Sequence, residues 1–298
     1  MGSKKQSLLR RSAPLVVSTV LIASATVAVA APRGGVPLTI NNPGFEANPV
    51  ADGCFAVFDP TGWSLYDPIG IRDCCADVIG GINCDTPYFP GGAPEGEHAG
   101  IVFLSGDIGG GPMGLTQVLG DVLEANTTYA LSAQVGNIAS GQGPPPCDVF
   151  GFFDLDGFPG YQVQLLAGGV IVAQDDNSLA GTIPEGEFRQ SAFYVTISES
   201  HPQLGQPLEV RLINLNMIDT SEDPGIEVDF DDVRLVIGCP HTGDMDENGL
   251  VDEFDAAILI DVLLEIDITE SHIDLADLDC SGVPDGADIA VFVDACLE

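Results

Sequence analysis

The sequence predicts a mainly β chain, in which a β-sandwich is followed by a small all-α module. Short β-rich segments separated by Gly, Pro, Asn and Asp fill residues 36–238. No helical pattern of comparable length occurs there. Residues 239–298 instead hold two copies of an acidic loop pattern, each followed by apolar residues at helical spacing. These observations predict two folded units of different class.

Residues 1–30 are predicted to be an export signal. A basic start precedes an apolar run over residues 15–30, and Ala28-Val29-Ala30 fits the small-residue cleavage rule. The basic residues are Lys4, Lys5, Arg10 and Arg11. A membrane anchor is the alternative, but the run is short and rich in small residues. We expect a secreted or cell-surface protein, and the route, Sec or twin-arginine, stays open.

The charge of the chain excludes two classes of partner. There are 45 acidic and nine basic residues, a net charge of −36, and every lysine lies within residues 1–30. Such a chain repels nucleic acid and anionic membranes. After residue 30 no stretch is apolar enough to cross a bilayer, so no membrane span is expected in the mature protein.

Residues 36–238 have the size and the pattern of one β-sandwich. Residues 128–135 and 208–215 alternate apolar and polar side chains, as strands with one buried face do. Further predicted strands cover residues 101–104, 115–119, 161–167, 170–173, 188–197 and 226–237. Residues 52–100 are rich in Gly, Pro and Cys and only weakly patterned, which indicates a long loop that is functional or tied by disulfides.

The two acidic loops predict a pair of calcium sites. Ca²⁺ takes about six to eight oxygen ligands, and glycine at the sixth loop position allows the sharp bend that such loops need. The ligands expected in the first loop are Asp244, Asp246, Asn248, the carbonyl of Leu250, Asp252 and Asp255. Those of the second are Asp277, Asp279, Ser281, the carbonyl of Val283, Asp285 and Asp288. A single loop of this kind can be an empty solvated turn, but the repeat favours paired sites.

Residues 240–298, with these loops and Asp at each twelfth position, resemble a dockerin. The resemblance implies a helix after each loop and a cohesin-bearing scaffold protein as partner. Pro284 departs from the pattern, and so do Glu253-Phe254 and Gly286-Ala287, which stand where Ser/Thr-like pairs are usual. Dockerin ends lie side by side, which implies a Cys239–Cys296 disulfide. Eight cysteines without a CxxC motif favour disulfides over a zinc site.

The ends of the central region carry a second resemblance. Residues 41–46 read Asn-Asn-Pro-Gly-Phe-Glu, and residues 228–235 read Val-Asp-Phe-Asp-Asp-Val-Arg-Leu. Such ends resemble galactose-binding-like jelly rolls among carbohydrate-binding modules, and secreted domains of the PEP-CTERM type. The jelly roll implies neighbouring first and last strands, so that Glu46 and Asp231 could hold a structural Ca²⁺; the alternative is two ordinary acids. Trp63 is either a core residue or a sugar platform, and core is favoured.

These readings predict a secreted, calcium-binding, carbohydrate-binding accessory protein for polysaccharide breakdown or surface attachment. Its expected partners are a cohesin scaffold and a polysaccharide or cell-surface glycan. The chain shows no Gly-x-Ser-x-Gly, His-Glu-x-x-His or phosphate-binding loop, so we expect no enzyme activity. The alternatives are a calcium-rigidified structural or adhesive protein, and a jelly-roll glycoside hydrolase that uses two carboxylates.

Overall fold

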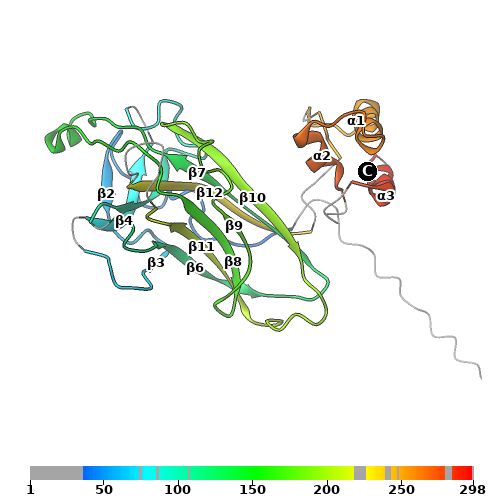
Figure 1. Ribbon diagram of the computed structural model, residues 1–298, viewed down its shortest axis with the longest axis horizontal. Helices are drawn as coiled ribbons and strands as arrows, with labels where there is room; N and C mark the ends of the chain where they lie inside the picture. Colours follow the sequence, from blue (N-terminus) through cyan, green and yellow to red (C-terminus); the bar gives the residue numbers. More distant parts are fainter. Residues whose placement is uncertain are drawn as a thin grey trace, which may run out of the picture. The chain divides into compact units, whose positions relative to one another are not determined.

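A computed structural model describes residues 36–73, 76–84, 87–106, 108–217, 226–238, 243–246, 248–278 and 284–296. Its central region is a sandwich of two antiparallel sheets, which confirms the predicted mainly β fold (Figure 1). The export signal predicted at residues 1–30 lies outside the described residues. The predicted boundaries at 36–238 and 239–298 stay predictions. Among the described residues, no helix is both long and apolar enough to cross a membrane.

The larger sheet has the strand order β10-β7-β12-β5-β4-β2, and β1 pairs with β12 at one end. Its strands are β1 (Val36–Pro37), β2 (Phe55–Val57), β4 (Asp77–Asn83), β5 (His98–Leu104), β7 (Thr128–Asn137), β10 (Glu187–Thr196) and β12 (Glu227–Ile237). The smaller sheet has the order β3-β6-β11-β8-β9. Its strands are β3 (Ser64–Tyr66), β6 (Met113–Val122), β8 (Tyr161–Ala167), β9 (Val170–Asp176) and β11 (Pro207–Asn214).

Alternation along the strands divides apolar side chains between two cores. Val102 and Leu104 of β5 belong to the core between the sheets, together with Val228 and Phe230 of β12. The intervening side chains of β5, including Ile101, belong to a second cluster on the other face of the larger sheet. Successive strand side chains point to opposite faces, so β5 is apolar on both. The larger sheet is therefore covered on its outer face as well.

The structure corrects the prediction of a long loop at residues 52–100, because β2, β3 and β4 lie there. Glycines in β4 explain why the pattern looked weak. A Cβ atom on Gly80 would lie 2.1 Å from the carbonyl oxygen of Ala56 in β2. Glycine normally weakens a strand, but here only glycine allows the two backbones to approach so closely.

The C-terminal described residues form three short helices: α1 (Glu253–Leu263), α2 (Glu270–Ala276) and α3 (Gly286–Ala295). Helix α1 begins with a capping box, in which Asp252 accepts from the Phe254 backbone and Asp255 from the Asp252 backbone, each at 2.8 Å. Six buried apolar residues form a small cluster here: Met245, Leu259, Val262, Ala276, Leu278 and Phe292.

A buried carboxylate, Asp175, connects the two sheets at one edge of the sandwich. It lies on β9 and accepts hydrogen bonds from Ser191 of β10 at 2.6 Å, from Tyr161 of β8 at 2.5 Å and from Ser178 at 2.9 Å. Burial alone would raise the pKa of Asp175, but these hydrogen bonds hold it below its ordinary value. The charge is thus satisfied without a cation.

Replacing this carboxylate should destabilise the fold. Asp175→Ala leaves buried hydroxyl groups without an acceptor, so we expect the free energy of unfolding to fall by roughly 2–4 kcal/mol. Wild type should also lose this contribution as the pH falls through the lowered pKa of Asp175. Urea denaturation at neutral and acidic pH measures both effects. Equal stability of variant and wild type at neutral pH would contradict this account.

Candidate active site

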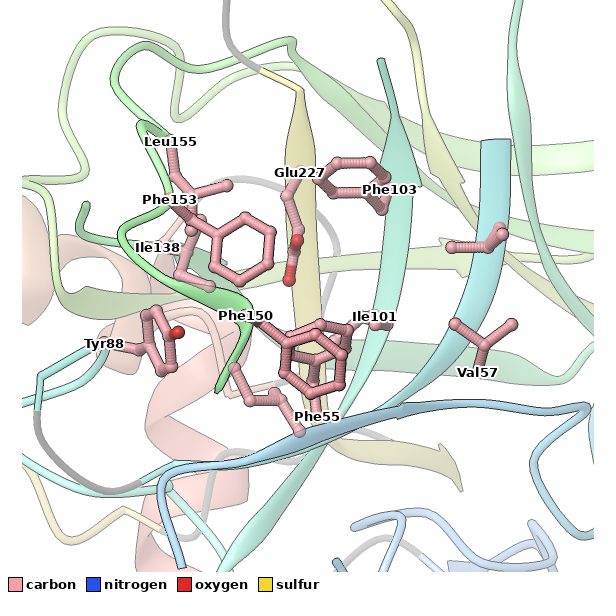
Figure 2. A pocket seen from close by; sticks show the side chains of 12 residues that line it. Phe55, Val57, Tyr88, Ile101, Phe103, Ile138, Phe150, Phe153, Leu155 and Glu227 are labelled. Carbon is pink, nitrogen blue, oxygen red and sulfur yellow. The ribbon is translucent and has the colours of Figure 1, made fainter. Parts of the chain in front are cut away.

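A cavity of about 380 Å³ lies on the outer face of the larger sheet. Strands β2, β4, β5 and β12 form its floor, and residues 138–155 cover it (Figure 2). Eleven of its twelve lining residues are apolar or aromatic: Phe55, Val57, Val78, Ile82, Tyr88, Ile101, Phe103, Ile138, Phe150, Phe153 and Leu155. The twelfth is Glu227. Apolar cavities with few polar groups are typical of small-molecule sites.

Aromatic rings make one wall of this cavity. Phe55 of β2 lies 5.4 Å from the ring of Phe150 and 5.4 Å from that of Phe153, with the second pair edge to face. A disulfide between Cys54 and Cys147 joins the two segments that carry these rings. The short helix η1 (Cys147–Phe150) begins at this disulfide. Flat aromatic ligands fit such walls through offset and edge-to-face contacts.

The acid of the cavity comes from the first residue of β12. Glu227, Asp229 and Asp231 alternate with Val228 and Phe230, so the three carboxyl groups share the outer face while the apolar side chains enter the core. Figure 2 shows the Glu227 carboxyl directed toward the aromatic rings that line the cavity. Only 6 % of Glu227 is exposed. The strand pattern thus places an acid inside an apolar chamber.

Burial favours the protonated forms of Glu227 and its neighbour Asp229. Loss of solvent raises the pKa of Glu227 well above its ordinary value. It raises the pKa of Asp229 further, and the nearby Glu227 adds to that effect. Asp229 is fully buried, and a side-chain hydrogen bond shared with Glu227 raises its pKa further. A carboxyl group whose pKa is raised in this way holds its proton to higher pH than an ordinary surface acid does, so it can serve as a proton donor.

The third acid of the strand, Asp231, differs from the other two. It accepts backbone hydrogen bonds from Glu95 at 2.8 Å and from Asp232 at 2.7 Å. Burial and the charges of Glu95 and Asp232 raise its pKa to about 8. Cys84, a buried free thiol, lies close enough to Asp229 and Asp231 for their charges to raise its pKa further above the value that burial sets.

The predicted calcium pair Glu46 and Asp231 flanks one segment, residues 95–98. Glu46 accepts backbone hydrogen bonds from Glu97 and His98 at 2.7 and 2.8 Å, and its other oxygen lies 2.6 Å from the His98 ring. Both carboxyl groups are thus used to hold this segment. A calcium ion at Glu46 and Asp231 stays a prediction.

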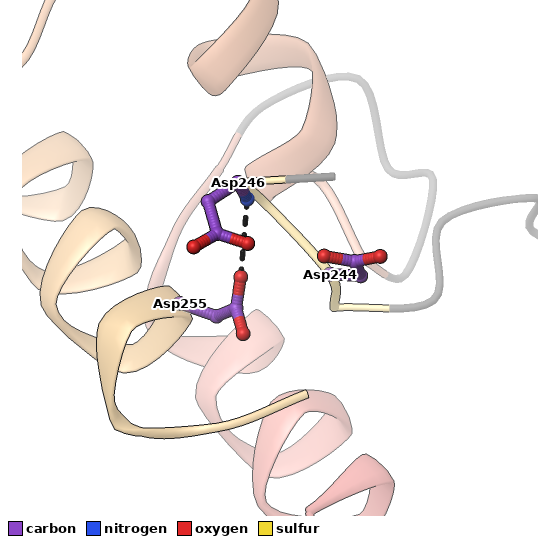
Figure 3. Close-up of side chains that lie close together, drawn as sticks. All are labelled: Asp244, Asp246 and Asp255. Carbon is purple, nitrogen blue, oxygen red and sulfur yellow. Dashed lines mark hydrogen bonds between the residues drawn. The ribbon is translucent and has the colours of Figure 1, made fainter. Parts of the chain in front are cut away.

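Three acids of the first calcium loop do converge. Asp244, Asp246 and Asp255 place carboxylate oxygens within 4.8 Å of one another, an arrangement that could hold a cation (Figure 3). Asn248 and Gly249 donate backbone hydrogen bonds to Asp244 at 3.0 and 2.8 Å, which folds the loop around these oxygens. Of the other predicted ligands in this loop, Asp252 caps α1, and Leu250 is exposed.

The second predicted loop is described only at its ends. Asp279, Ser281 and Val283 lie outside the described residues, while Asp277 and Asp288 are buried. Asp285 donates its backbone N–H to Asp288 at 2.7 Å, as Asp252 does to Asp255 in the first loop. The predicted Cys239–Cys296 disulfide also stays a prediction, because Cys239 lies outside the described residues.

Trp63 confirms the core alternative, since it is 4 % exposed and donates its ring N–H to the Asn42 carbonyl at 3.0 Å. Three other aromatic residues of the sandwich, Phe55, Tyr88 and Phe153, line the cavity. The sequence analysis missed Glu227 and Asp229 as site residues. The sequence does contain a pattern that could have indicated them, namely acids at every second position of an otherwise apolar strand.

Comparison with known protein families identifies the family to which the sandwich belongs. Residues 36–236 match the family model HpiC1-like, described as HpiC1 cyclase. The chain belongs to the HpiC1-like family. The match spans the whole sandwich, so it includes the cavity and the three acids of β12.

Solved structures agree with this assignment. The Stig cyclase Fisc from Fischerella sp. TAU, solved with (3Z)-3-(1-methyl-2-pyrrolidinylidene)-3H-indole, is 36 % identical, with a TM-score of 0.59. The match covers 68 % of this chain and 98 % of that one. A Fischerella sp. TAU cyclase with 4-(1H-indol-3-yl)butan-2-one is 36 % identical over 68 % of this chain and 97 % of that one, with a TM-score of 0.58. No curated protein sequence matches the chain.

These findings correct several predictions. The sandwich belongs to a cyclase family, so identification as a carbohydrate-binding module and the expectation of no enzyme activity are wrong. Two of the matching cyclase structures were solved with indole compounds, so the expectation of a polysaccharide or cell-surface glycan partner is wrong. Neither the family nor these structures support the dockerin resemblance or its cohesin partner. A jelly-roll-like sandwich was predicted correctly, but its function was not.

The raised pKa of Glu227 makes stability depend on pH. An acid that holds its proton longer in the folded state stabilises the fold at low pH, and this contribution is lost as the pH rises through the folded pKa. Glu227→Gln cannot lose a proton. From about pH 5 to about pH 9 its free energy of unfolding should therefore fall less than that of wild type, by on the order of 2 kcal/mol. Urea titrations across this range test the difference, and parallel curves would count against a buried, protonated Glu227.

Proposed function

We propose that this chain is an exported enzyme that cyclises an indole-containing small molecule by acid catalysis in the cavity on the outer face of the larger sheet. The observation that carries the proposal is the Glu227 carboxyl, buried inside an otherwise apolar and aromatic cavity that raises its pKa. Membership of the HpiC1-like family supports cyclisation as the reaction class. The indole compounds in related cyclase structures support the substrate class.

The geometry suits proton-initiated ring closure. Glu227 would donate a proton to an unsaturated carbon or imine nitrogen of the bound substrate, which creates a cation. The aromatic wall of Phe55, Phe150 and Phe153 stabilises such a cation through its ring faces and excludes the water that would trap it. A carbon–carbon bond then forms, a proton leaves the ring and returns to the carboxylate, and the product is an isomer of the substrate.

Asp229 supports this role of Glu227. Two carboxyl groups that close to each other in an apolar site resist sharing two negative charges, so loss of one proton disfavours loss of the second. The pair therefore keeps a proton available near the cavity. Phe103 of β5 and Ile82 of β4 complete an environment in which the acid form is favoured.

Substitution of the acid tests the proposal. With an indole substrate that can undergo ring closure, Glu227→Gln should lower kcat about 10²–10⁴-fold, because the amide keeps the shape but cannot donate a proton. Glu124→Gln, at an exposed acid, serves as the matched control and should retain full activity. Chromatography with mass spectrometry detects the product at unchanged mass. Full activity of Glu227→Gln would contradict the proposed mechanism.

Wild-type activity should fall as the pH rises through the raised pKa of Glu227, since only the protonated form donates. A rate profile that rises over the same range would point to a general base instead.

We also propose that the loop of residues 244–255 binds Ca²⁺. The converging carboxylates of Asp244, Asp246 and Asp255 are hard oxygen donors of the kind that this ion prefers, and a cation would relieve their mutual repulsion. No step of the proposed reaction uses this ion. It would instead hold the loop that leads into α1.

Calorimetric titration of the full chain with CaCl₂ tests the calcium proposal. Asp244→Asn should abolish or weaken a binding event at least tenfold, because it removes one charged ligand. Asp261→Asn, on the exposed side of α1, is the control and should bind as wild type does. Identical isotherms for wild type and Asp244→Asn would exclude this loop as a calcium site.

Export is the remaining part of the proposal. The Cys54–Cys147 disulfide supports an oxidising compartment, as does the export signal expected at residues 1–30.

A further inference from the structure

The segment that covers the cavity folds back on itself. We call residues 140–156 the flap. At its base Ser140 donates to Asp156 at 2.5 Å and accepts from the Leu155 backbone at 2.8 Å. Gly141 and Phe153 exchange two backbone hydrogen bonds of 3.0 and 2.7 Å. The flap is thus a closed loop with a hydrogen-bonded base rather than an extended crossing.

The tip of the flap is tied covalently to the far side of the cavity. Cys147 in the tip bonds to Cys54, 93 residues earlier, immediately before β2. Next to this bond the tip lies very close to the neighbouring backbone, since a Cβ atom on Gly143 would lie 2.7 Å from the Gly53 carbonyl oxygen. Strand β2 is the edge strand of the larger sheet. The disulfide therefore joins the flap tip to this edge of the sheet.

This disulfide also sets the position of the aromatic wall. Cys54 precedes Phe55, and Cys147 lies in the same short helix as Phe150. The inner side of the flap lines the cavity, whereas Phe152 points away and is 67 % exposed. Phe150 is itself 57 % exposed, and its ring lies against that of Phe55.

We propose that the Cys54–Cys147 disulfide is a latch that holds the flap closed over the cavity, and that it controls how tightly and how long an aromatic ligand is held. The inference rests on the proposed function, because it takes the cavity to be the ligand site. A closed flap keeps the three phenylalanine rings preorganised, so a ligand does not have to order them on binding.

The latch can be released by a thiol or phosphine reductant. The reductant supplies two electrons, the sulfur–sulfur bond breaks, and two protons from solvent complete the thiols of Cys54 and Cys147. The tip then keeps only its non-covalent contacts. Opening of the flap would expose the cavity, shorten the residence time of the ligand and admit water to Glu227.

The test compares ligand exchange with and without the latch in the full chain. The probe is 4-(1H-indol-3-yl)butan-2-one, and stopped-flow measurements give its dissociation rate. We expect the double variant Cys54→Ser/Cys147→Ser, or wild type reduced with a phosphine, to release the probe at least tenfold faster. Hydrogen exchange should show loss of protection in the flap and none in β6 and β11.

Two controls separate the latch from general destabilisation. Phe152→Ala lies in the flap but outside the cavity and should release the probe as wild type does. Asp175→Ala weakens the sheet connection between β9 and β10, at the edge of the larger sheet opposite β2, and should leave the release rate unchanged. Equal release from latched and unlatched protein, or equally fast release from Asp175→Ala, would overturn the inference.

A failure of the proposed function can be distinguished from a failure of the latch. If wild type does not bind the probe, the cavity is not an indole site. Hydrogen exchange then decides on the latch alone, because unchanged protection of the flap after reduction refutes it and selective loss of protection supports it.

Discussion

Burial of Glu227 and Asp229 on the outer face of the larger sheet is the constraint on which the rest of the site depends. An ionised carboxylate in an apolar cavity without a cation or a donor costs many kcal/mol, so the group takes up a proton instead. Strand β12 carries apolar and acidic residues in alternation. Because Val228 and Phe230 pack in the core between the sheets, the acids must lie on the outer face. The alternation of residues along β12 therefore determines both the core packing of this strand and the environment of its acids.

The cover of the cavity follows from the same constraint. The acids stay neutral only while water is excluded, and the sheet alone cannot exclude it. Residues 138–155 supply the missing layer, and their aromatic side chains meet Phe55 from the opposite edge. Asp175 differs from these acids, because it is buried among three hydroxyl donors and keeps its charge. Burial with donors gives a structural anion, whereas burial among hydrocarbon gives an acid.

Sequence reasoning could predict the sandwich because strands such as β7 alternate clearly between half-buried and buried side chains. It could not predict the cavity, whose walls come from segments about a hundred residues apart with no period of their own. Phe55 and Phe150 meet through a disulfide whose partners spacing alone could not reveal. The glycines of β4 are typical of loops, so the sequence did not predict this strand inside the larger sheet.

The functional error has a physical origin as well. Gly-x-Ser-x-Gly, His-Glu-x-x-His and phosphate-binding loops are local sequence patterns, whereas an acid needs only burial, and burial is a property of the fold. The acidic loop at residues 244–255 was visible in the sequence because its ligands are local, and Asp244, Asp246 and Asp255 do converge. Local patterns were therefore predicted well, and the site built from distant segments was not.

Infrared difference spectroscopy tests the central claim most directly. The spectrum of wild type at neutral pH minus that of Glu227→Gln should contain a carbonyl stretching band of a protonated carboxyl group. Its frequency should be that of an apolar environment, and the band should disappear as the pH is raised. A difference spectrum that contains only carboxylate bands at neutral pH would contradict the account, because Glu227 would then be ionised and unable to act as the acid.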